Sequence, residues 1–414
     1  MIAICEYNEC TGCMACYNVC SKRAIKMLPN EEGFLHPVIN QEQCVDCGLC
    51  AKVCPVNTPV LKKEPQSAFC GWSNDENTRM TSSSGGAFAE LAKLILSHGG
   101  VVYGVAMDEH IEARHISISN AKELTRLQGS KYVQSIVGDS FVRVKRDLEK
   151  NKVVLFSGTP CQVAGLRNFL RCDYDNLYTV DLVCHGVPSP KVFDDYKRYI
   201  VKKIKEPIRD IQFRYKKSSW IFFSMGVNSQ SKEKGIQKFS YTGGYYSDPY
   251  FRAFLKDNIL RPNCYNCLYA EKNRVGDFTI ADWWKYKSRS KFDKDFEKKG
   301  VSLILCNTEK ARLLVKRLNM YLSERTIAEA INTNKPLRSP FPVPITRDMF
   351  WNDYNHMSFE DLIPKWMSPE KIPLSIYLKI YKENKRVLYS IVNLYERLVR
   401  KLYLEKLIIK IQAK

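Results

Sequence analysis

Two runs of cysteine with identical spacing constrain this chain more than any other feature. The first run places Cys10, Cys13, Cys16 and Cys20 in the pattern C-x-x-C-x-x-C-x-x-x-C, and the second repeats it at Cys44, Cys47, Cys50 and Cys54. Three thiolates at this spacing wrap one corner of an iron–sulfur cube, and the fourth cysteine of each run reaches the other cube. The runs therefore predict two 4Fe-4S clusters.

The same rule predicts which cysteines share a cluster. Cys10, Cys13, Cys16 and Cys54 form the first cysteine set, and Cys44, Cys47, Cys50 and Cys20 form the second. This is the spacing of two-cluster ferredoxins, so residues 1–60 are expected to form a small ferredoxin-like dicluster domain. A pair of zinc ribbons is the alternative, but two identical four-member runs favour clusters. Cys5 belongs to neither run and is expected to be a small buried hydrophobe.

The rest of the composition is that of a folded protein in a reducing compartment. The chain has 414 residues and 16 cysteines, its start lacks the pattern of a signal peptide, and no apolar run approaches the length of a membrane span. We therefore expect a cytoplasmic protein. In such a compartment clustered cysteines bind metal or carry out redox chemistry more often than they form structural disulfides.

The pattern changes beyond residue 66. Helices are predicted over 87–97, 140–150 and 162–170, and strands over 101–106, 153–156 and 178–183. This alternation indicates βαβ units around a mostly parallel sheet. Residues from about 190 to 333 mix strands such as 211–215 with helices such as 310–321, which indicates α+β structure. The fold class is thus a multidomain α/β and α+β chain, with a small domain expected at 1–60, one module in two parts at 66–183 and 184–350, and a helical tail at 351–414.

Four further cysteines are expected to meet in one crevice. Cys161 and Cys184 each follow a predicted strand, and ligands of open α/β sheets bind at the carboxyl ends of the strands. Cys264 and Cys267 can add two more ligands and complete a third cysteine set. Spacing alone leaves zinc, a redox dithiol and a third cluster open. His185, next to Cys184, could donate a proton or be an ordinary structural histidine. Cys70, Cys172 and Cys306 are expected in the core.

A second candidate site begins at a predicted helix. The segment Ser82-Ser83-Ser84-Gly85-Gly86 precedes Ala87, and small residues there would expose backbone N–H groups at the positive end of the helix dipole, which suits a pyrophosphate. The alternative is an ordinary serine N-cap. The segment Gly129-Ser130-Lys131-Tyr132 adds a lysine and hydroxyls that could meet a phosphate or a flavin ring.

Together these motifs resemble the family of coenzyme F-420 hydrogenase/dehydrogenase beta subunits, in the form with an N-terminal dicluster ferredoxin. The resemblance covers roughly residues 1–350. It rests on the two cysteine runs, residues 82–86 and 129–132, Gly158-Thr159-Pro160-Cys161-Gln162, Cys184-His185-Gly186, Cys264-x-x-Cys267, Gly276-Asp277 and Asp282-Trp283-Trp284.

The resemblance implies a catalytic module in which FAD lies beside a third 4Fe-4S cluster. Carried onto this chain, Cys161, Cys184, Cys264 and Cys267 would hold that cluster. The flavin site would be lined by Ser83, Ser84, Gly85, Gly86, Ser130, Lys131, Tyr132, Gly158 and Thr159. His185 is the candidate catalytic residue.

The expected function is that of an iron–sulfur flavoprotein oxidoreductase. Electrons would pass between a redox partner such as ferredoxin, the clusters, FAD and a small substrate, which could be a deazaflavin coenzyme or another molecule. Some members of the family accompany polysaccharide synthesis, which offers one setting for this chain. The alternatives are a non-catalytic subunit that relays electrons to a partner enzyme, and a redox-sensing regulator.

The charge of the chain is unevenly distributed. The formal net charge is +20, but residues 1–60 carry −2. Residues 371–414 carry +8, and Leu388, Ile391, Tyr395, Leu398 and Leu402 form one apolar stripe of a helix. This tail could lie on an anionic membrane surface or dock on protein with a solvated basic face. No nucleic-acid-binding motif accompanies the charge, so nucleic acid is not an expected partner.

Overall fold

The computed structural model describes residues 4–216, 219–229, 239–284, 286 and 296–368. Residues 1–368 form one compact unit, and residues 369–414 are assigned to a second. The predicted amphipathic helix of the tail lies outside the described residues.

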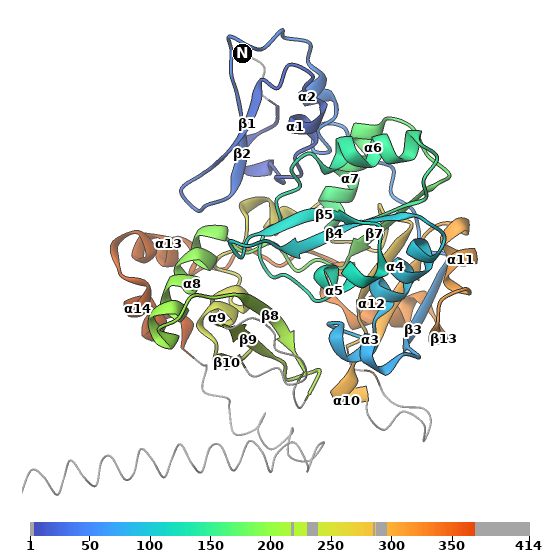
Figure 1. Ribbon diagram of the computed structural model, residues 1–414. Helices are drawn as coiled ribbons and strands as arrows, with labels where there is room; N and C mark the ends of the chain where they lie inside the picture. The colour runs from blue at the N-terminus through green and yellow to red at the C-terminus, as the bar shows by residue number, and fades with distance from the viewer. Residues whose placement is uncertain (1–3, 217–218, 230–238, 285, 287–295, 369–414) are drawn as a thin grey trace, which may run out of the picture. The chain divides into compact units, whose positions relative to one another are not determined.

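The N-terminal segment is a hairpin with two very short helices. Strands β1 (Ile25–Pro29) and β2 (Leu35–Ile39) pair antiparallel, while α1 (Ala15–Val19) and α2 (Leu49–Lys52) follow the turns that carry the cysteines (Figure 1). The residues before these helices, Met14 and Gly48, have φ of 65° and 69°. This left-handed conformation folds the backbone back on itself, and at Gly48 it costs nothing sterically. The compact turns hold the cysteines of each run close together.

An eight-stranded mixed sheet forms the centre of the remaining chain. The strand order is β13-β3-β12-β11-β7-β6-β4-β5. The strands are β3 (Ser67–Ser73), β4 (Val101–Met107), β5 (Ala113–Ile118), β6 (Val154–Gly158), β7 (Leu177–Leu182), β11 (Phe278–Asp282), β12 (Ser302–Cys306) and β13 (Met320–Arg325). The neighbouring strands β11, β7, β6 and β4 are parallel to one another, whereas the other four strand pairs of the sheet are antiparallel. The predicted parallel βαβ units are confirmed, but the sheet as a whole is mixed rather than mostly parallel.

Helices cover both faces of this sheet. On one face α4 (Ala87–Ser97), α5 (Leu124–Leu127) and α11 (Glu309–Val315) pack on Val102, Leu155 and Val180. On the other, α6 (Ser140–Glu149) and α7 (Pro160–Leu170) pack on alternate residues of the same strands, together with Met14 of the N-terminal segment. This two-sided burial explains why the central strands are almost wholly apolar.

A second, smaller layer adjoins the sheet. It contains α8 (Pro190–Ile204), the three-stranded antiparallel sheet β8 (Asp210–Tyr215), β9 (Ser224–Asn228) and β10 (Tyr241–Gly244), α9 (Pro249–Leu255), and the helices α13 (Arg347–His356) and α14 (Phe359–Leu362). Aromatic side chains dominate its core, including Tyr196, Phe213 and Tyr250. The remaining described elements are short helices and turns. The helices are α3 (Glu76–Thr81), α10 (Phe296–Lys299) and α12 (Ile327–Thr333). The turns are the 3-10 turns η1 (Tyr7–Glu9), η2 (Ala121–Glu123), η3 (Pro262–Asn266) and η4 (Lys335–Leu337) and the π-helical turn η5 (Ile363–Met367).

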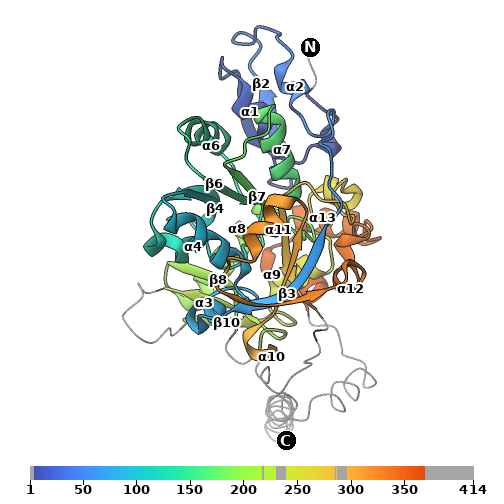
Figure 2. The same ribbon diagram turned by 90° about the vertical axis from the view of Figure 1, so that its right-hand side faces the viewer.

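Most predicted elements are confirmed, but the extent of one helix and the place of Cys172 differ from the prediction. The helix predicted over 310–321 ends at Val315, because residues 320–325 form β13 and pair with β3, Met320 opposite Ser73. Cys172 is exposed rather than in the core, since it follows the last turn of α7. Cys70 and Cys306 are buried as predicted. The two parts expected at 66–183 and 184–350 share one sheet, because β7 (labelled in Figure 2) pairs with β11.

Candidate active site

The first cysteine set is gathered and buried. Burial raises the pKa of the Cys16 thiol, and the thiols of Cys13, Cys10 and Cys54 raise it further. All four side chains are buried. Cys5, expected to be a buried hydrophobe, is instead half-buried and shares hydrogen bonds with Cys10 and Cys54.

The second cysteine set lies nearer the surface. Burial raises the pKa of Cys50, with smaller contributions from the thiols of Cys47 and Cys44. Cys47 is exposed, and Cys44, Cys50 and Cys20 are half-buried. Cys20 accepts a hydrogen bond from the Ala24 N–H at 3.3 Å and packs in the same small cluster as Cys50.

The structure also brings the third cysteine set together. Cys161 lies in the first turn of α7, Cys184 follows β7, and Cys264 and Cys267 lie in and directly after the turn η3. Burial raises the pKa of Cys184, and the thiols of Cys264, Cys161 and Cys267 raise it further. Because β6 and β7 are parallel neighbours, the residues after their carboxyl ends meet at one edge of the sheet.

Each set has the number and kind of ligands that a 4Fe-4S cluster uses, four cysteines. In the described ranges no three His, Cys, Asp or Glu side chains lie as close together as a single metal ion requires. Thiolates at the corners of an iron–sulfur cube stand further apart than ligands of one ion.

The first and third sets are neighbours. A Cβ added to Gly165 of α7 would lie 3.0 Å from the Cys13 sulfur, so α7 and the N-terminal segment are in close contact there. Tyr269 is buried between the sets: burial raises its pKa, and the thiols of Cys161, Cys13, Cys267 and Cys54 all contribute. The three sets therefore form a row, with the exposed second set at one end.

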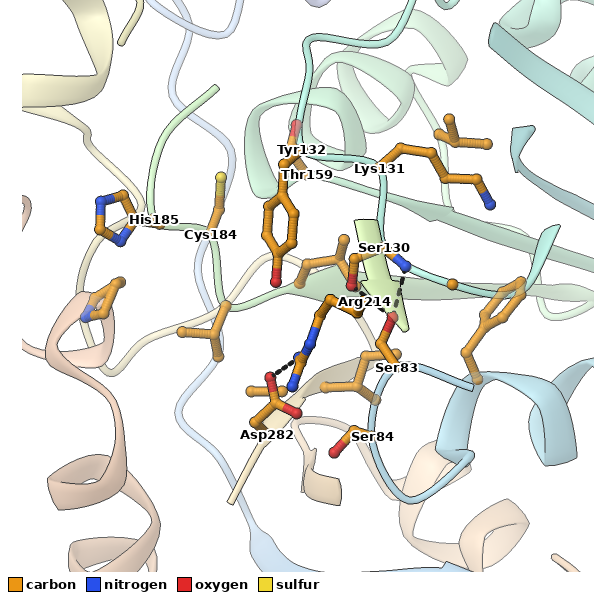
Figure 3. A pocket seen from close by; sticks show the side chains of 18 of the residues that line it. Ser83, Ser84, Ser130, Lys131, Tyr132, Thr159, Cys184, His185, Arg214 and Asp282 are labelled. Atoms are coloured by element: carbon orange, nitrogen blue, oxygen red, sulfur yellow. Dashed lines mark hydrogen bonds and ion pairs between the residues drawn. The ribbon is translucent and has the colours of Figure 1, made fainter. Parts of the chain in front are cut away.

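A cavity of about 670 Å³ lies at the other end of this row (Figure 3). Cys184 and His185 line it together with eight of the nine predicted flavin residues. These are Ser83, Ser84, Gly86, Ser130, Lys131, Tyr132, Gly158 and Thr159. Gly85 does not line the cavity. A Cβ at Gly85 would lie 2.3 Å from the Gly71 carbonyl oxygen, so this glycine lets the serine loop approach β3.

Small polar groups shape one wall of the cavity. Ser83 Oγ accepts hydrogen bonds from the Ser130 N–H at 2.6 Å and from Ser130 Oγ at 2.9 Å (Figure 3). Gly86, the N-cap residue of α4, has φ of 100° and provides no side-chain cap. The N–H of Ala87 in the first turn donates to Ser302 Oγ at 3.5 Å. The helix therefore begins at a glycine rather than at a serine N-cap.

Lys131 has local partners of its own. Its Nζ donates to the carbonyls of Gln128 at 2.8 Å, Leu127 at 3.2 Å and Arg126 at 3.3 Å. Burial lowers its pKa to about 7. The ammonium therefore satisfies the last carbonyls of α5, while the lysine stem lines the cavity.

Two basic residues of the site have no local sequence signal. Arg214 of β8 lines the cavity, pairs with Asp282 at the end of β11, and lies over the Trp284 ring at 5.4 Å. Lys216, just beyond β8, is buried behind the serine loop and donates to the Ser84 carbonyl at 3.0 Å. Asp282 and Trp284 belong to a motif noted in the sequence, but their cationic partner comes from a different part of the chain.

His185 is held at the cavity by three contacts. Its Nε2 lies 2.5 Å from Asp257 Oδ1, its ring stacks on Phe341 with centroids 3.9 Å apart, and Phe254 lies against it at 4.9 Å. Asp257 ends the turn after α9 with φ of 61°, an uncommon conformation for a residue other than glycine. This backbone arrangement aims the carboxylate at the imidazole.

Matches to known families agree with this architecture. Residues 68–139 match the N-terminal model of the coenzyme F-420 hydrogenase/dehydrogenase beta subunit, and residues 151–330 match the C-terminal model of the same beta subunit. Residues 9–58 match the 4Fe-4S dicluster domain. The fold and the cysteines define an iron–sulfur electron-transfer protein of the oxidoreductase type. The chain belongs to the family of coenzyme F-420 hydrogenase/dehydrogenase beta subunits, with an N-terminal 4Fe-4S dicluster domain.

Similar individual proteins are redox proteins or their subunits. The chain is 21% identical over 254 residues to the F subunit of the F(420)H(2) dehydrogenase of Methanosarcina mazei, covering 57% of this chain and 70% of the relative. It is 24% identical over 214 residues to coenzyme F-420-dependent sulfite reductase of Methanocaldococcus jannaschii, covering 48% of this chain and 34% of the relative. Among solved structures, a chain of the F-420-reducing NiFe hydrogenase complex of Methanosarcina barkeri is similar, with a TM-score of 0.43 and 11% identity over 72% of this chain and 94% of that one.

Within the described residues, no helix combines the length and apolar character needed to cross a membrane.

Proposed function

We propose that this protein is a flavin-dependent iron–sulfur oxidoreductase that exchanges electrons between a redox protein partner and a small substrate bound in the cavity. Cys161, Cys184, Cys264 and Cys267 would hold a third 4Fe-4S cluster, and FAD would occupy the cavity. The observation that carries the proposal is the continuity of the row: the third set adjoins the first set at Cys13 and reaches the cavity at Cys184.

The cavity fits a flavin dinucleotide in its chemistry. The glycine-capped first turn of α4 would bind the pyrophosphate, because the N–H groups at a helix start and the helix dipole favour an anion. Tyr132 and Trp284 offer aromatic surface for a ring system, and Arg214 supplies a buried positive charge. A bound flavin would supply two-electron hydride chemistry and accept or give electrons singly. The protein's residues position it and limit access of water.

His185 would act on the substrate as a proton donor or acceptor. It lines the same cavity, and Asp257 fixes the orientation of its ring and selects the tautomer with a proton on Nε2. That arrangement leaves Nδ1 free to exchange a proton when hydride is added to or removed from a substrate. The substrate would be a deazaflavin coenzyme or another small molecule.

The second cysteine set would be the contact point for the redox partner. Cys47 is exposed there, together with Val45 at 59%. Residues 1–60 are net acidic, so a partner protein with a basic contact face would be steered towards them.

Metal and flavin content of the full chain, purified without oxygen, tests the proposal. About twelve iron atoms and one FAD per chain are expected for three clusters and one flavin. Cys184→Ser should lower iron to about eight, two clusters' worth, while the control Cys172→Ser, at an exposed cysteine, should match the wild type. About eight iron atoms with zinc and no flavin in the wild type would overturn the proposal.

Turnover separates this proposal from a relay role. The exposed second set alone would also suit a subunit that only passes electrons to a partner enzyme. If the holoprotein oxidises a reduced ferredoxin only when a partner enzyme is added, the relay function holds. Catalysis by the purified chain with a small acceptor, lost in His185→Ala and in Cys184→Ser but not in Cys172→Ser, would support the enzyme.

A further inference from the structure

Arg261 is a buried cation held by neutral groups. Its side chain is 1% exposed, and no ion pair joins it to a carboxylate among the described residues. Burial raises the pKa of Glu32, and the Arg261 charge opposes that rise, but this carboxylate is already paired with Arg347. Its hydrogen-bond acceptors are the carbonyls of Cys10 at 2.6 Å and Leu35 at 3.1 Å, Gln134 Oε1 at 2.9 Å and His36 Nε2 at 3.1 Å. Removing a cation from water without a compensating negative charge is expensive. Something at this position must compensate for it.

The position of Arg261 indicates what the compensation is. Its guanidinium donates to the backbone of Cys10 in the first set, and its own carbonyl accepts the N–H of Cys264 in the third set at 2.8 Å. Burial raises the pKa of Cys161 and of Cys264, and the positive charge of Arg261 opposes that rise. At Cys10 the interaction with Cys5 lowers the pKa, and the Arg261 charge adds a smaller contribution in the same direction. Arg261 is therefore close to thiols of both sets at once.

Two neighbours tighten this arrangement. Gly12, inside the first run, has φ of 67°, and a Cβ there would lie 2.5 Å from Gln134 Nε2 and 2.8 Å from Arg261 Nη1. His36 contacts Arg261 and also hydrogen-bonds the Cys10 thiol. The loop of the first set therefore packs directly against the guanidinium.

We propose that Arg261 is a positioning residue that serves as the shared countercharge of two iron–sulfur clusters, one held by the first set and one by the third. This inference rests on the proposed third cluster. A cube with four thiolates is anionic and gains one negative charge on reduction, so a fixed cation between two of them stabilises the reduced form of each.

The same placement suits transfer between the sets. When one electron moves, the donor side is oxidised by one electron and the acceptor side is reduced by one, so the total negative charge around Arg261 stays the same. The guanidinium keeps its hydrogen bonds to Cys10, Gln134 and Leu35 in either state, because none of these partners gains or loses a proton. Little reorganisation is then needed around the cation.

The test is a redox titration of the full holoprotein, followed by electron paramagnetic resonance, with Arg261→Gln and Arg261→Lys. The Cys184→Ser background assigns which signal belongs to the third set. Arg261→Gln should lower both midpoint potentials, each by about a tenfold change in the reduction equilibrium, or about 59 mV for one electron. Arg261→Lys, which keeps the charge, should restore most of both shifts.

Arg347→Met together with Glu32→Gln is the matched control, because it removes a cation without leaving the Glu32 carboxylate unpaired near Arg261. Arg347 also joins the N-terminal hairpin to the module, through Glu32 at 2.5 Å, and its other hydrogen bonds go to the Tyr265 hydroxyl and the Leu260 carbonyl rather than to a cysteine. The double change should leave both potentials unchanged. Three results would overturn the inference. Arg261→Gln could leave both midpoint potentials unchanged, it could shift the potential of only one cluster, or Arg261→Lys could shift the potentials as much as Arg261→Gln does.

Iron content keeps the outcomes distinct. If Arg261→Gln loses iron, the Arg261→Lys variant decides between the two explanations. Wild-type iron content and potentials in Arg261→Lys would support a role for the charge, and loss of iron in both variants would refute it. A wild type with only two clusters would instead refute the proposed third cluster, whatever Arg261 does.

Discussion

Replacing Asp181 by Asn leaves a buried guanidinium without its counterion. Asp181 on β7 is fully buried, and its Oδ1 accepts hydrogen bonds from Arg274 Nη2 at 2.7 Å and from Thr279 Oγ1 at 2.8 Å. Its Oδ2 accepts from the backbone N–H of Gly276 at 2.7 Å. Arg274 is 1% exposed. Breaking such a pair from one side costs about 3–5 kcal/mol, mostly because the remaining charge is unpaired.

The same pair supports the third cysteine set. Arg274 also donates to the carbonyls of Tyr269 at 2.7 Å and Leu182 at 3.2 Å. These contacts tie the segment after Cys267 to the end of β7, two residues before Cys184. Asp181→Asn should therefore reduce the iron bound at the third set as well as the stability of the fold.

Urea unfolding of the holoprotein, followed by tryptophan fluorescence, gives the magnitude. Asp181→Asn should lose about 3–5 kcal/mol, and Asp181→Asn with Arg274→Met should lose at least about 2 kcal/mol less than the sum of the single changes. The control is Glu309→Gln, which breaks the exposed pair with Arg312 and should leave the free energy of unfolding almost unchanged. A loss below about 1 kcal/mol in Asp181→Asn, or additive single changes, would refute the reasoning.

Three further predictions concern buried groups near the cavity. Burial lowers the pKa of His115 to about 4, so the unfolded chain takes up a proton at higher pH than the folded chain does. The free energy of unfolding should therefore fall by about 2 kcal/mol from pH 7 to pH 5. His115→Phe should weaken this pH dependence, which urea unfolding at each pH would measure. Gly85→Ala should lower the stability of the fold by about 1–3 kcal/mol, measured by thermal unfolding, and should release flavin, measured by fluorescence. The control Gly244→Ala, whose added Cβ would have a neighbouring atom only at 3.5 Å, should lower stability less. Lys216→Met removes the donor from the carbonyls of Arg79, Ser84 and Lys299 and should lower stability by roughly 2–4 kcal/mol. Lys216→Arg is the comparison for retained charge, and an unchanged melting temperature in Lys216→Met would contradict this role.

Much of the fold and of the candidate site could be predicted from local sequence patterns. The ligand spacing of the two cysteine runs is contained in a few turns, and the third set follows from one topological rule, because Cys161 and Cys184 come after adjacent parallel strands. The helix beginning at Ala87 was predictable for the same reason, since its boundaries depend on nearby residues. Such features need no knowledge of distant contacts.

The remainder depends on partners far along the chain. Nothing near Arg214, Lys216 or Arg261 indicates that their cationic groups meet Asp282, the Ser84 carbonyl and the Cys10 carbonyl. Residues 316–321 continue an apolar helical spacing, yet pairing with β3 makes a strand from Met320 onward. Tertiary pairing overrides local propensity there.

The place of β3 in the sheet has a consequence for synthesis of the protein. This strand, Ser67–Ser73, is hydrogen-bonded on both sides to strands that the ribosome makes much later, Ser302–Cys306 and Met320–Arg325. At ordinary rates of elongation the interval is on the order of ten seconds or more. During that time the N-terminal cysteine runs have already emerged, while an apolar strand beside them has no partner. On the nascent chain β3 therefore stays unpaired until β12 has been made, and its open edges are exposed to pairing with another chain during that time.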